Sequence, residues 1–179
     1  GFDVVLKFEY KRLYFWGVYS LTKNDRWNGD VVTKTTFNYP PNFDRRHNVN
    51  LVGSYTFGKK RNFEINVRWN YGSPFPTTPT QGYYPQLNFN NNLNYNYTTA
   101  NGQVGYLPGE LNSVRLPDFH RLDIGFKYRY HLNPKTLLEI SGGATNIYNR
   151  KNIFYVNRFT FKRIDQLPIM PNVNLGLSF

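Results

Sequence analysis

The stretch FEINVRWNY at residues 63–71 decides the fold class, because its residues alternate between two kinds of side chain. A large apolar residue occupies every second position, and polar or charged residues fill the positions between. Side chains of a β-strand point alternately to opposite faces, so the pattern predicts a strand with one apolar and one polar face. No segment shows the 3.6-residue period of an amphipathic helix. The sequence therefore predicts an all-β protein.

Six other segments repeat this alternation and are rich in aromatic and β-branched residues. They span residues 3–10, 13–23, 49–57, 122–131, 136–147 and 172–179. The second of them is apolar on both faces at its start. Together with residues 63–71, these segments predict seven antiparallel strands.

The composition limits the classes of function. The chain has 179 residues, a net charge of +11 and 18% aromatic residues, but no cysteine, which excludes disulfides and thiolate metal sites. Its cations are spread along the chain instead of forming one run, so we expect no nucleic-acid partner. No apolar run approaches the roughly 18 residues of a membrane helix. These observations do not exclude a transmembrane β-barrel, because its strands need only roughly 9–11 residues each.

The connections between the predicted strands fall into two groups. Short turns are expected at residues 11–12, 58–61 and 133–135. Long loops are expected at residues 24–46, 72–119 and 148–168. Outer-membrane barrels sort their connections in this way, with short turns on the periplasmic side and long loops outside. The pattern therefore favours an antiparallel transmembrane β-barrel over a soluble sandwich.

The side chains of the predicted strands fit a barrel wall with a wet lumen. The charged residues expected to face the lumen, where acids offset bases, are Glu64, Arg68, Asp123, Lys127, Arg129 and Glu139. Aromatic residues gather at the short-turn ends of the strands, where an interfacial girdle lies in such barrels. They are Tyr10, Phe57, Phe63, Tyr128, Tyr130 and Phe179.

Seven strands do not close a bacterial barrel, because single-chain barrels have even strand numbers and an open edge in lipid leaves backbone groups unpaired. We therefore expect further strands upstream of Gly1. One alternative is a free-standing small barrel, closed by an eighth strand at residues 153–156 or 159–161, that acts as an adhesin, an anchor or a lipid-modifying enzyme. A second alternative is a soluble all-β glycan-binding module.

A series of motifs resembles one known family. The stretches are GVYSLTKNDRW, FDRRHNVNLVGSYTF, INVRWNYGSPFP, RLPDFHRLDIGFKY, ATNIYNRKN and the terminal LGLSF. Their order resembles the C-terminal end of TonB-dependent outer-membrane receptors, and most of all the SusC/RagA-like type of Bacteroidetes. The resemblance covers essentially the whole chain. It implies that residues 1–179 form the last seven strands of a 22-stranded barrel domain, and that the plug domain and the TonB box are absent from this chain.

The resemblance also implies a function, a location and a set of partners. The function is energised uptake of a nutrient, such as a glycan, a peptide or a siderophore-like compound, without catalysis or a cofactor. The location is the outer membrane of a Gram-negative bacterium, with a periplasmic C-terminus. The partners are outer-membrane lipid, the TonB complex through a missing N-terminal region, a SusD-like lipoprotein lid and the barrel-assembly machinery. That machinery would read the terminal face formed by Val173, Leu175, Leu177 and Phe179.

Candidate substrate contacts lie in and near the long loops. They are Arg45, Arg46, Tyr83, Tyr84, Tyr95 and Tyr97. The arginines either grip an anionic or hydroxyl-rich substrate or anchor the loop base through ion pairs across strands. The same two interpretations apply to the charged residues of segment 115–123. Tyrosines beside asparagines suit sugar or peptide capture, but such stretches are as often simply solvated loop.

Catalysis and metal binding have little support. Ser113, Asp118 and His120 could be imagined as a triad, but their spacing matches no nucleophile motif. The three histidines of the chain are scattered and form no ligand cluster. We therefore expect neither an enzyme nor a metal site.

Overall fold

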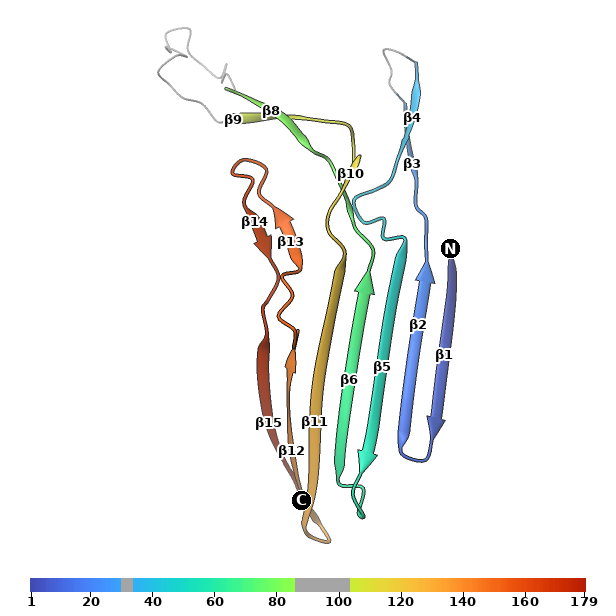
Figure 1. Cartoon of the computed structure of the whole chain (residues 1–179), viewed down its shortest axis with the longest axis vertical. Helices are drawn as coiled ribbons and strands as arrows, with labels where there is room; N and C mark the ends of the chain where they lie inside the picture. Colours follow the sequence, from blue (N-terminus) through green and yellow to red (C-terminus); the bar gives the residue numbers. More distant parts are fainter. Residues whose placement is uncertain (30–33, 86–103) are drawn as a thin grey trace.

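The computed structural model describes residues 1–29, 34–85 and 104–179, and these residues are all-β. Seven long strands form one antiparallel sheet in the order of the chain (Figure 1). They are β1 (Phe2–Tyr10), β2 (Leu13–Leu21), β5 (His47–Phe57), β6 (Phe63–Gly72), β11 (Phe119–Asn133), β12 (Thr136–Thr145) and β15 (Met170–Ser178). The seven predicted strands are confirmed, with small shifts at their ends. Phe179 was expected to end the last strand, but β15 stops one residue earlier and leaves the ring beyond it.

The short turns lie together at one end of the sheet (Figure 1). They join β1 to β2, β5 to β6, and β11 to β12. Gly58 opens the second turn with a φ of 88°, and a Cβ atom there would come within 2.7 Å of the Asn62 side chain. Only glycine adopts this conformation without strain, so the turn type follows from the sequence.

The long connections were expected as loops, but their described residues form four two-stranded ribbons. Their strands are β3 (Arg26–Gly29) with β4 (Thr36–Tyr39), β7 (Pro76–Thr77) with β10 (Val114–Arg115), β8 (Thr80–Pro85) with β9 (Val104–Pro108), and β13 (Ile153–Val156) with β14 (Arg163–Asp165). These strands have two to six residues, too few for alternation to stand out in the sequence.

The eighth strand that would close a small barrel is not found in the main sheet of the described residues. Residues 153–156 do form β13, but β13 pairs with β14 and not with the main sheet. Residues 159–161 are not a strand. Within the described part of the chain, therefore, this loop adds no eighth strand to the sheet, and no closed barrel is formed.

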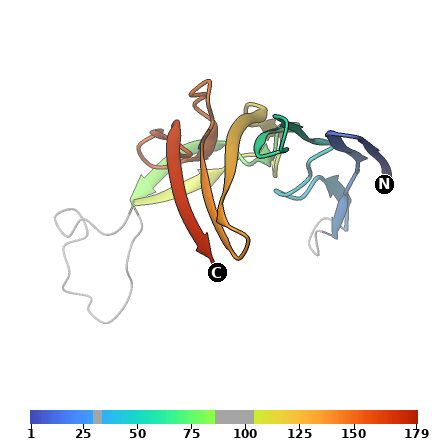
Figure 2. The same cartoon turned by 90° about the horizontal axis from the view of Figure 1, so that it is seen from below.

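The main sheet is a single layer, and its strands follow one another in one row when seen from below (Figure 2). Substantial contacts between the described elements occur only between paired strands. No hydrophobic residue of the described part of the chain is buried. β1 and β15 are the two edges of the sheet. The described residues thus lack the second layer that normally covers an apolar sheet face.

The strand register collects the apolar side chains on one face. One row across the sheet runs from Tyr55 through Ile65, Phe126 and Gly142 to Val173. The Phe126 ring covers Gly142, where a Cβ atom would lie 2.8 Å from it. These apolar side chains are exposed, with Phe126 at 51% and Val173 at 80% of their accessible surface. The alternation of the sequence has therefore produced a continuous apolar face.

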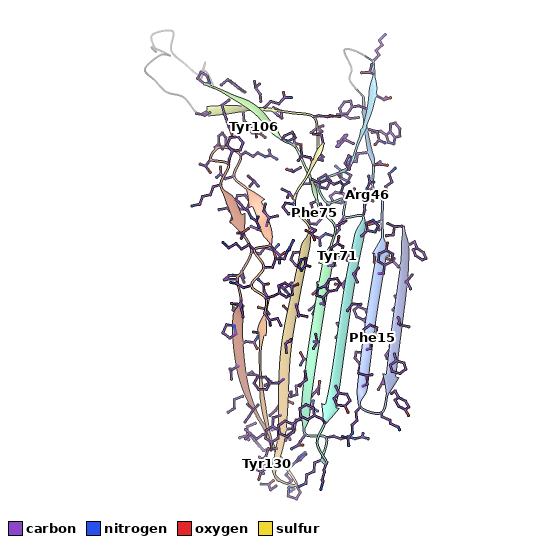
Figure 3. All side chains as sticks on the ribbon, in the orientation of Figure 1. Phe15, Arg46, Tyr71, Phe75, Tyr106 and Tyr130 are labelled. Carbon is purple, nitrogen blue, oxygen red and sulfur yellow. The ribbon has the colours of Figure 1, made fainter. Side chains whose placement is uncertain are left out.

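Aromatic rings line this face near both strand ends. At the short-turn end, the ring centroids of Phe63 and Phe57 are 5.3 Å apart, those of Phe63 and Tyr128 are 4.5 Å apart, and those of Tyr128 and Tyr130 are 6.4 Å apart. Figure 3 labels Tyr130 at this end of the sheet. At the long-loop end, Trp69 stacks on Tyr71 at 6.0 Å. The apolar face is thus bordered by rings at both ends.

Candidate functional site

The opposite face of the sheet carries charged residues in contact with one another. Arg129 lies between two acids, with its Nη2 3.5 Å from Glu64 and its Nε donating a 3.1 Å hydrogen bond to Glu139. Lys127 adds a 3.5 Å ion pair to Glu139. All of these side chains are a quarter or more exposed, so solvent screens each pair and its contribution to stability is small. Together they form an exposed, largely neutralised surface.

The other two residues predicted to face a lumen lie on the same face, because Arg68 is directly opposite Asp123 in the register. Asp123 also accepts a 2.9 Å hydrogen bond from the Arg121 guanidinium and another from the backbone N–H of Asn146. All six predicted residues therefore share one face of the sheet. A hollow of about 300 Å³ borders this surface near Asn66 and Lys127.

The loop base above β5 and β6 is centred on Asp44, whose side chain is fully buried. Its carboxylate accepts hydrogen bonds from Arg115 Nη2 at 3.0 Å, from Arg46 Nε at 3.4 Å and from the backbone N–H of Asn24 at 3.1 Å. Arg115 also donates to the carbonyl of Pro74 at 2.9 Å. Asp44 thus ties together three loop segments that are far apart in the sequence.

The electrostatics of Asp44 follow from these contacts. Burial by itself raises the pKa of its carboxyl group. The hydrogen bonds from Arg115, Asn24 and Arg46 act in the opposite direction and outweigh burial, so the pKa lies below its usual value. Asp44 is therefore an ionised anchor at neutral pH.

Arg45 lies between aromatic rings at the same loop base. Its guanidinium is 4.1 Å from the ring centroid of Phe75 and 5.5 Å from that of Phe119. Gly72 makes room for it, because a Cβ atom there would come within 2.3 Å of the guanidinium. The buried Nε of Arg45 has no hydrogen-bond partner in the structure, and burial lowers the pKa of the group. Arg45 packs as a cation on rings, and Arg46 pairs with Asp44 two residues away. Neither contact is the ion pair across neighbouring strands that the anchoring interpretation expected, although both lie within the loop base.

A second loop base, above β11 and β12, depends on two buried asparagines. Asn146 is 1% exposed and donates to the carbonyls of Arg150 at 2.9 Å and Leu167 at 3.2 Å. Asn152 is 3% exposed and makes a reciprocal pair with the backbone of His120, accepting at 3.2 Å and donating at 2.9 Å. These amides replace the backbone pairing that is lost where the strands end.

Sequence reasoning did not single out Asn146, Asn152 or Asp44 as candidates. The asparagines lie in ATNIYNRKN, a motif that carried the family resemblance, and Asp44 directly precedes the two arginines that were singled out. The sequence feature that could have identified them is the large number of Asn and charged residues at the predicted strand ends. Such residues are typical of turns, so the signal did not separate anchors from ordinary loop residues.

Two long loops contact each other beyond these bases. The ring of Phe159, between β13 and β14, lies 6.1 Å from Tyr83 of β8 and 6.0 Å from Tyr106 of β9. The guanidinium of Arg158 donates a 2.6 Å hydrogen bond to the Tyr106 hydroxyl, and the Tyr83 hydroxyl donates to the carbonyl of Arg158. We name these four residues the loop clasp. It joins segments more than fifty residues apart.

The predicted loop tyrosines have different positions. Tyr83 belongs to the loop clasp. Tyr84 lies across the backbone of Gly105, where a Cβ atom would come within 2.5 Å of its ring. Both side chains are more than a third exposed, as a role in ligand contact would require. Tyr95 and Tyr97 lie outside the described residues.

The residues of the imagined triad each have a different partner. The Ser113 hydroxyl donates to the carbonyl of Glu110 at 3.1 Å, and Asp118 pairs with Arg150 at 2.8 Å. The Nδ1 atom of His120 lies 2.7 Å from the Tyr148 hydroxyl. In the described ranges, no group of His, Asp and Glu side chains is arranged to hold a metal ion. No helix in those ranges is long and apolar enough to span a membrane.

No protein-family model matches the chain, and neither a curated protein nor a solved structure gives a significant match. The function must therefore be argued from the geometry of the sheet and its loops.

Proposed function

We propose that the chain forms part of the wall of an outer-membrane β-barrel, and that this barrel belongs to a TonB-dependent transporter of the SusC-like type. The observation that carries the proposal is the single-layer sheet with a continuous exposed apolar face. In water such a face is normally covered by a second layer, which the described residues do not provide. Lipid is a covering that fits its shape and chemistry.

The dimensions of the apolar face support a membrane environment. β1, β2 and β15 have nine residues, and β6 and β12 have ten. A tilted transmembrane strand needs roughly 9–11 residues. The rings at both ends of the strands then lie at the two interfaces, where tyrosine and tryptophan are stable because each combines an apolar ring with a polar group.

The edges of the sheet support closure by further strands. β1 and β15 each pair on one side only. An unpaired backbone group in lipid costs several kcal/mol, so a sheet with such edges is not stable there by itself. We propose that other strands close the sheet into a barrel, with 22 strands in total by resemblance. β15, followed by Phe179, would be the segment that the assembly machinery reads.

The two sides of the barrel wall suit transport. The charged face would line a wet lumen, and the long loops would face the outside and capture a nutrient. A plug and a TonB-binding segment, which would couple uptake to energy, are part of the proposed whole protein. The substrate class stays open among glycans, peptides and siderophore-like compounds.

Residues 1–179 contain no cysteine, so single cysteines introduced into this part of the protein can test the lipid-facing assignment. Single cysteines are introduced at Ile65 and Val173 on the apolar face, and at Asn66 and Lys127 on the polar face. Isolated outer membranes are then treated with a charged, water-soluble maleimide. We expect labelling at Asn66 and Lys127 only, and labelling at all four sites after denaturation. Equal labelling of both faces in intact membranes would contradict the proposal.

A second test addresses transport. Cells lacking the gene are compared with complemented cells for accumulation of a panel of labelled glycans, peptides and iron–siderophore complexes. We expect one class to accumulate only in the complemented cells and to be lost when a protonophore dissipates the proton gradient. Accumulation that resists the protonophore would indicate a passive channel instead.

A further inference from the structure

The three short turns carry most of the cations at their end of the sheet. The side chains concerned are Lys11 and Arg12 in the first turn, Lys59, Lys60 and Arg61 in the second, and Lys135 in the third. No turn contains an acidic residue. Figure 1 shows that all three turns lie at the same end. We name these six residues the basic rim.

The basic rim differs from the charged clusters elsewhere in the molecule. On the polar face and in the long loops, cations such as Arg46, Arg115 and Arg129 contact carboxylates. Among the described residues, none of the six rim cations forms an ion pair. The acids nearest to the three turns in the sequence are Glu9, Glu64 and Glu139. All three lie on strands, and Arg129 pairs with Glu64 and Glu139. The rim is therefore an uncompensated positive surface.

The position of the basic rim relates it to the apolar face. The ring contacts of Phe57, Phe63, Tyr128 and Tyr130 lie directly next to the turns. Lys11 extends over the Tyr10 ring, with its Nζ 4.9 Å from the ring centroid. Aromatic side chains of membrane proteins lie at the level of the lipid headgroups. Cations immediately beyond them reach the level of the phosphates.

We propose that the basic rim binds anionic phospholipid headgroups of the leaflet on the short-turn side. This inference rests on the proposed function, because it requires the apolar face to be in lipid. Lysine and arginine side chains donate charge-assisted hydrogen bonds to phosphate oxygens, and arginine does so with two nitrogens at once. Each cation near an anionic membrane strengthens binding by roughly fivefold.

The geometry of the second turn supports a shared site. Gly58 and Arg61 both have positive φ, at 88° and 54°, so the turn has a defined shape rather than an extended one. Lys59, Lys60 and Arg61 are all exposed. Three adjacent donors on one tight turn can contact one or two headgroups together. The neighbouring turns provide further cations along the same row.

The test uses the protein as its own cells make it, purified in detergent. Native mass spectrometry measures how much phosphatidylglycerol and how much phosphatidylcholine the protein retains when both are added equally. The test variant is Lys59→Gln, Lys60→Gln, Arg61→Gln. The control variant is Lys34→Gln, Lys151→Gln, Lys162→Gln, which removes the same charge from exposed positions at the long-loop end.

We expect the wild type and the control to prefer phosphatidylglycerol, and the test variant to lose about tenfold or more of this preference. An unchanged preference in the test variant, or an equal loss in the control, would overturn the inference. Cysteine labelling separates this failure from failure of the proposed function. If Ile65 and Val173 stay protected while the lipid preference is unchanged, only the basic rim inference is wrong; if they are labelled, the proposed function is wrong.

Discussion

The two faces of the sheet, taken with their adjoining loops, are stabilised from different sources. The polar side is satisfied within the chain: Arg129 lies between two acids, Asp44 collects three donors, and Asn146 bonds to the backbone of two loop segments. The apolar side has rings and aliphatic chains in rows, but nothing in the described structure covers them. The polar side is stabilised by contacts within the chain, whereas the apolar side needs a covering from outside the described residues. Substitutions on the two sides should therefore have different consequences.

The largest effect is expected where a charge enters the apolar face. Ile124→Arg or Leu175→Arg should hinder assembly, at a cost of about 2–4 kcal/mol if the site is near the bilayer midplane. Lys127→Gln on the polar face should be tolerated, because it loses only one exposed ion pair. The measurement is the amount of folded, heat-modifiable protein in the outer membrane. Equal amounts of folded protein for all three variants would contradict the assignment of one face to lipid and the other to water.

The next effect concerns the buried carboxylate of the first loop base. Asp44→Asn should destabilise that base by about 2–3 kcal/mol, because charge-assisted hydrogen bonds from Arg115 and Arg46 are weakened. The change is measured by hydrogen exchange of the amides of Asn24 and Ser73. Asp25→Asn serves as the control, since its ion pair with Lys23 is a surface pair. Equal exchange in both variants would show that Asp44 is not an anchor.

Asp44 also predicts a pH dependence. Its pKa in the folded protein is below the unfolded value of about 4, so its stabilisation is present above that value and is lost as the pH falls through the folded pKa. The protection of the Asn24 and Ser73 amides, corrected for the intrinsic exchange rate at each pH, should therefore fall below about pH 4 in the wild type. The Asp44→Asn variant should lack this step. An identical acid response in both proteins would assign the step to other carboxylates.

A smaller effect is expected at the second loop base. Asn146→Ala should cost about 1–2 kcal/mol, because the carbonyls of Arg150 and Leu167 lose their donor in a buried place. Asn38→Ala on exposed β4 provides the control. Limited proteolysis between β12 and β15 reports the change. If both variants are cut at the wild-type rate, the buried amide does not hold the loop.

The smallest effect concerns the loop clasp. Phe159→Ala removes the ring that contacts both Tyr83 and Tyr106, at a cost of about 1 kcal/mol. Phe154→Ala is the control, because Phe154 is exposed and its ring contact is with its neighbour Tyr155. Fluorescence anisotropy of a dye placed on β8 should fall in the first variant only. A fall in both would show a general loosening of the loops.

The sequence predicted the parts of the fold that depend on a local pattern. In β6, every second residue from Phe63 to Tyr71 is apolar. The neighbouring strands must pair with β6 in the register that places their apolar residues on the same face. The positions of short turns followed from the same pattern. The ribbon formed by β7 and β10 was not predicted, because strands of two residues are too short to show a period.

The candidate site was less predictable, because its contacts join distant segments. Asp44 meets Arg115 across 71 residues, and Tyr83 meets Arg158 across 75. No local pattern encodes such pairs. Arg45 and Arg46 were recognised as a feature, but the ring partners of Arg45, Phe75 and Phe119, lie on other segments of the chain. Whether any of these residues contacts a substrate stays a prediction.

The order of strands in the sheet has a consequence for how such a protein changes during evolution. Each long strand lies beside the strands that precede and follow it in the sheet, and neighbours run in opposite directions. Loss or duplication of β5 and β6 together would leave antiparallel neighbours and keep every turn at its own end. Loss of β5 alone would leave β2 beside β6, two strands that run the same way and need a crossover to be joined. The topology therefore favours gain or loss of whole hairpins, which changes the width of the sheet in steps of two strands.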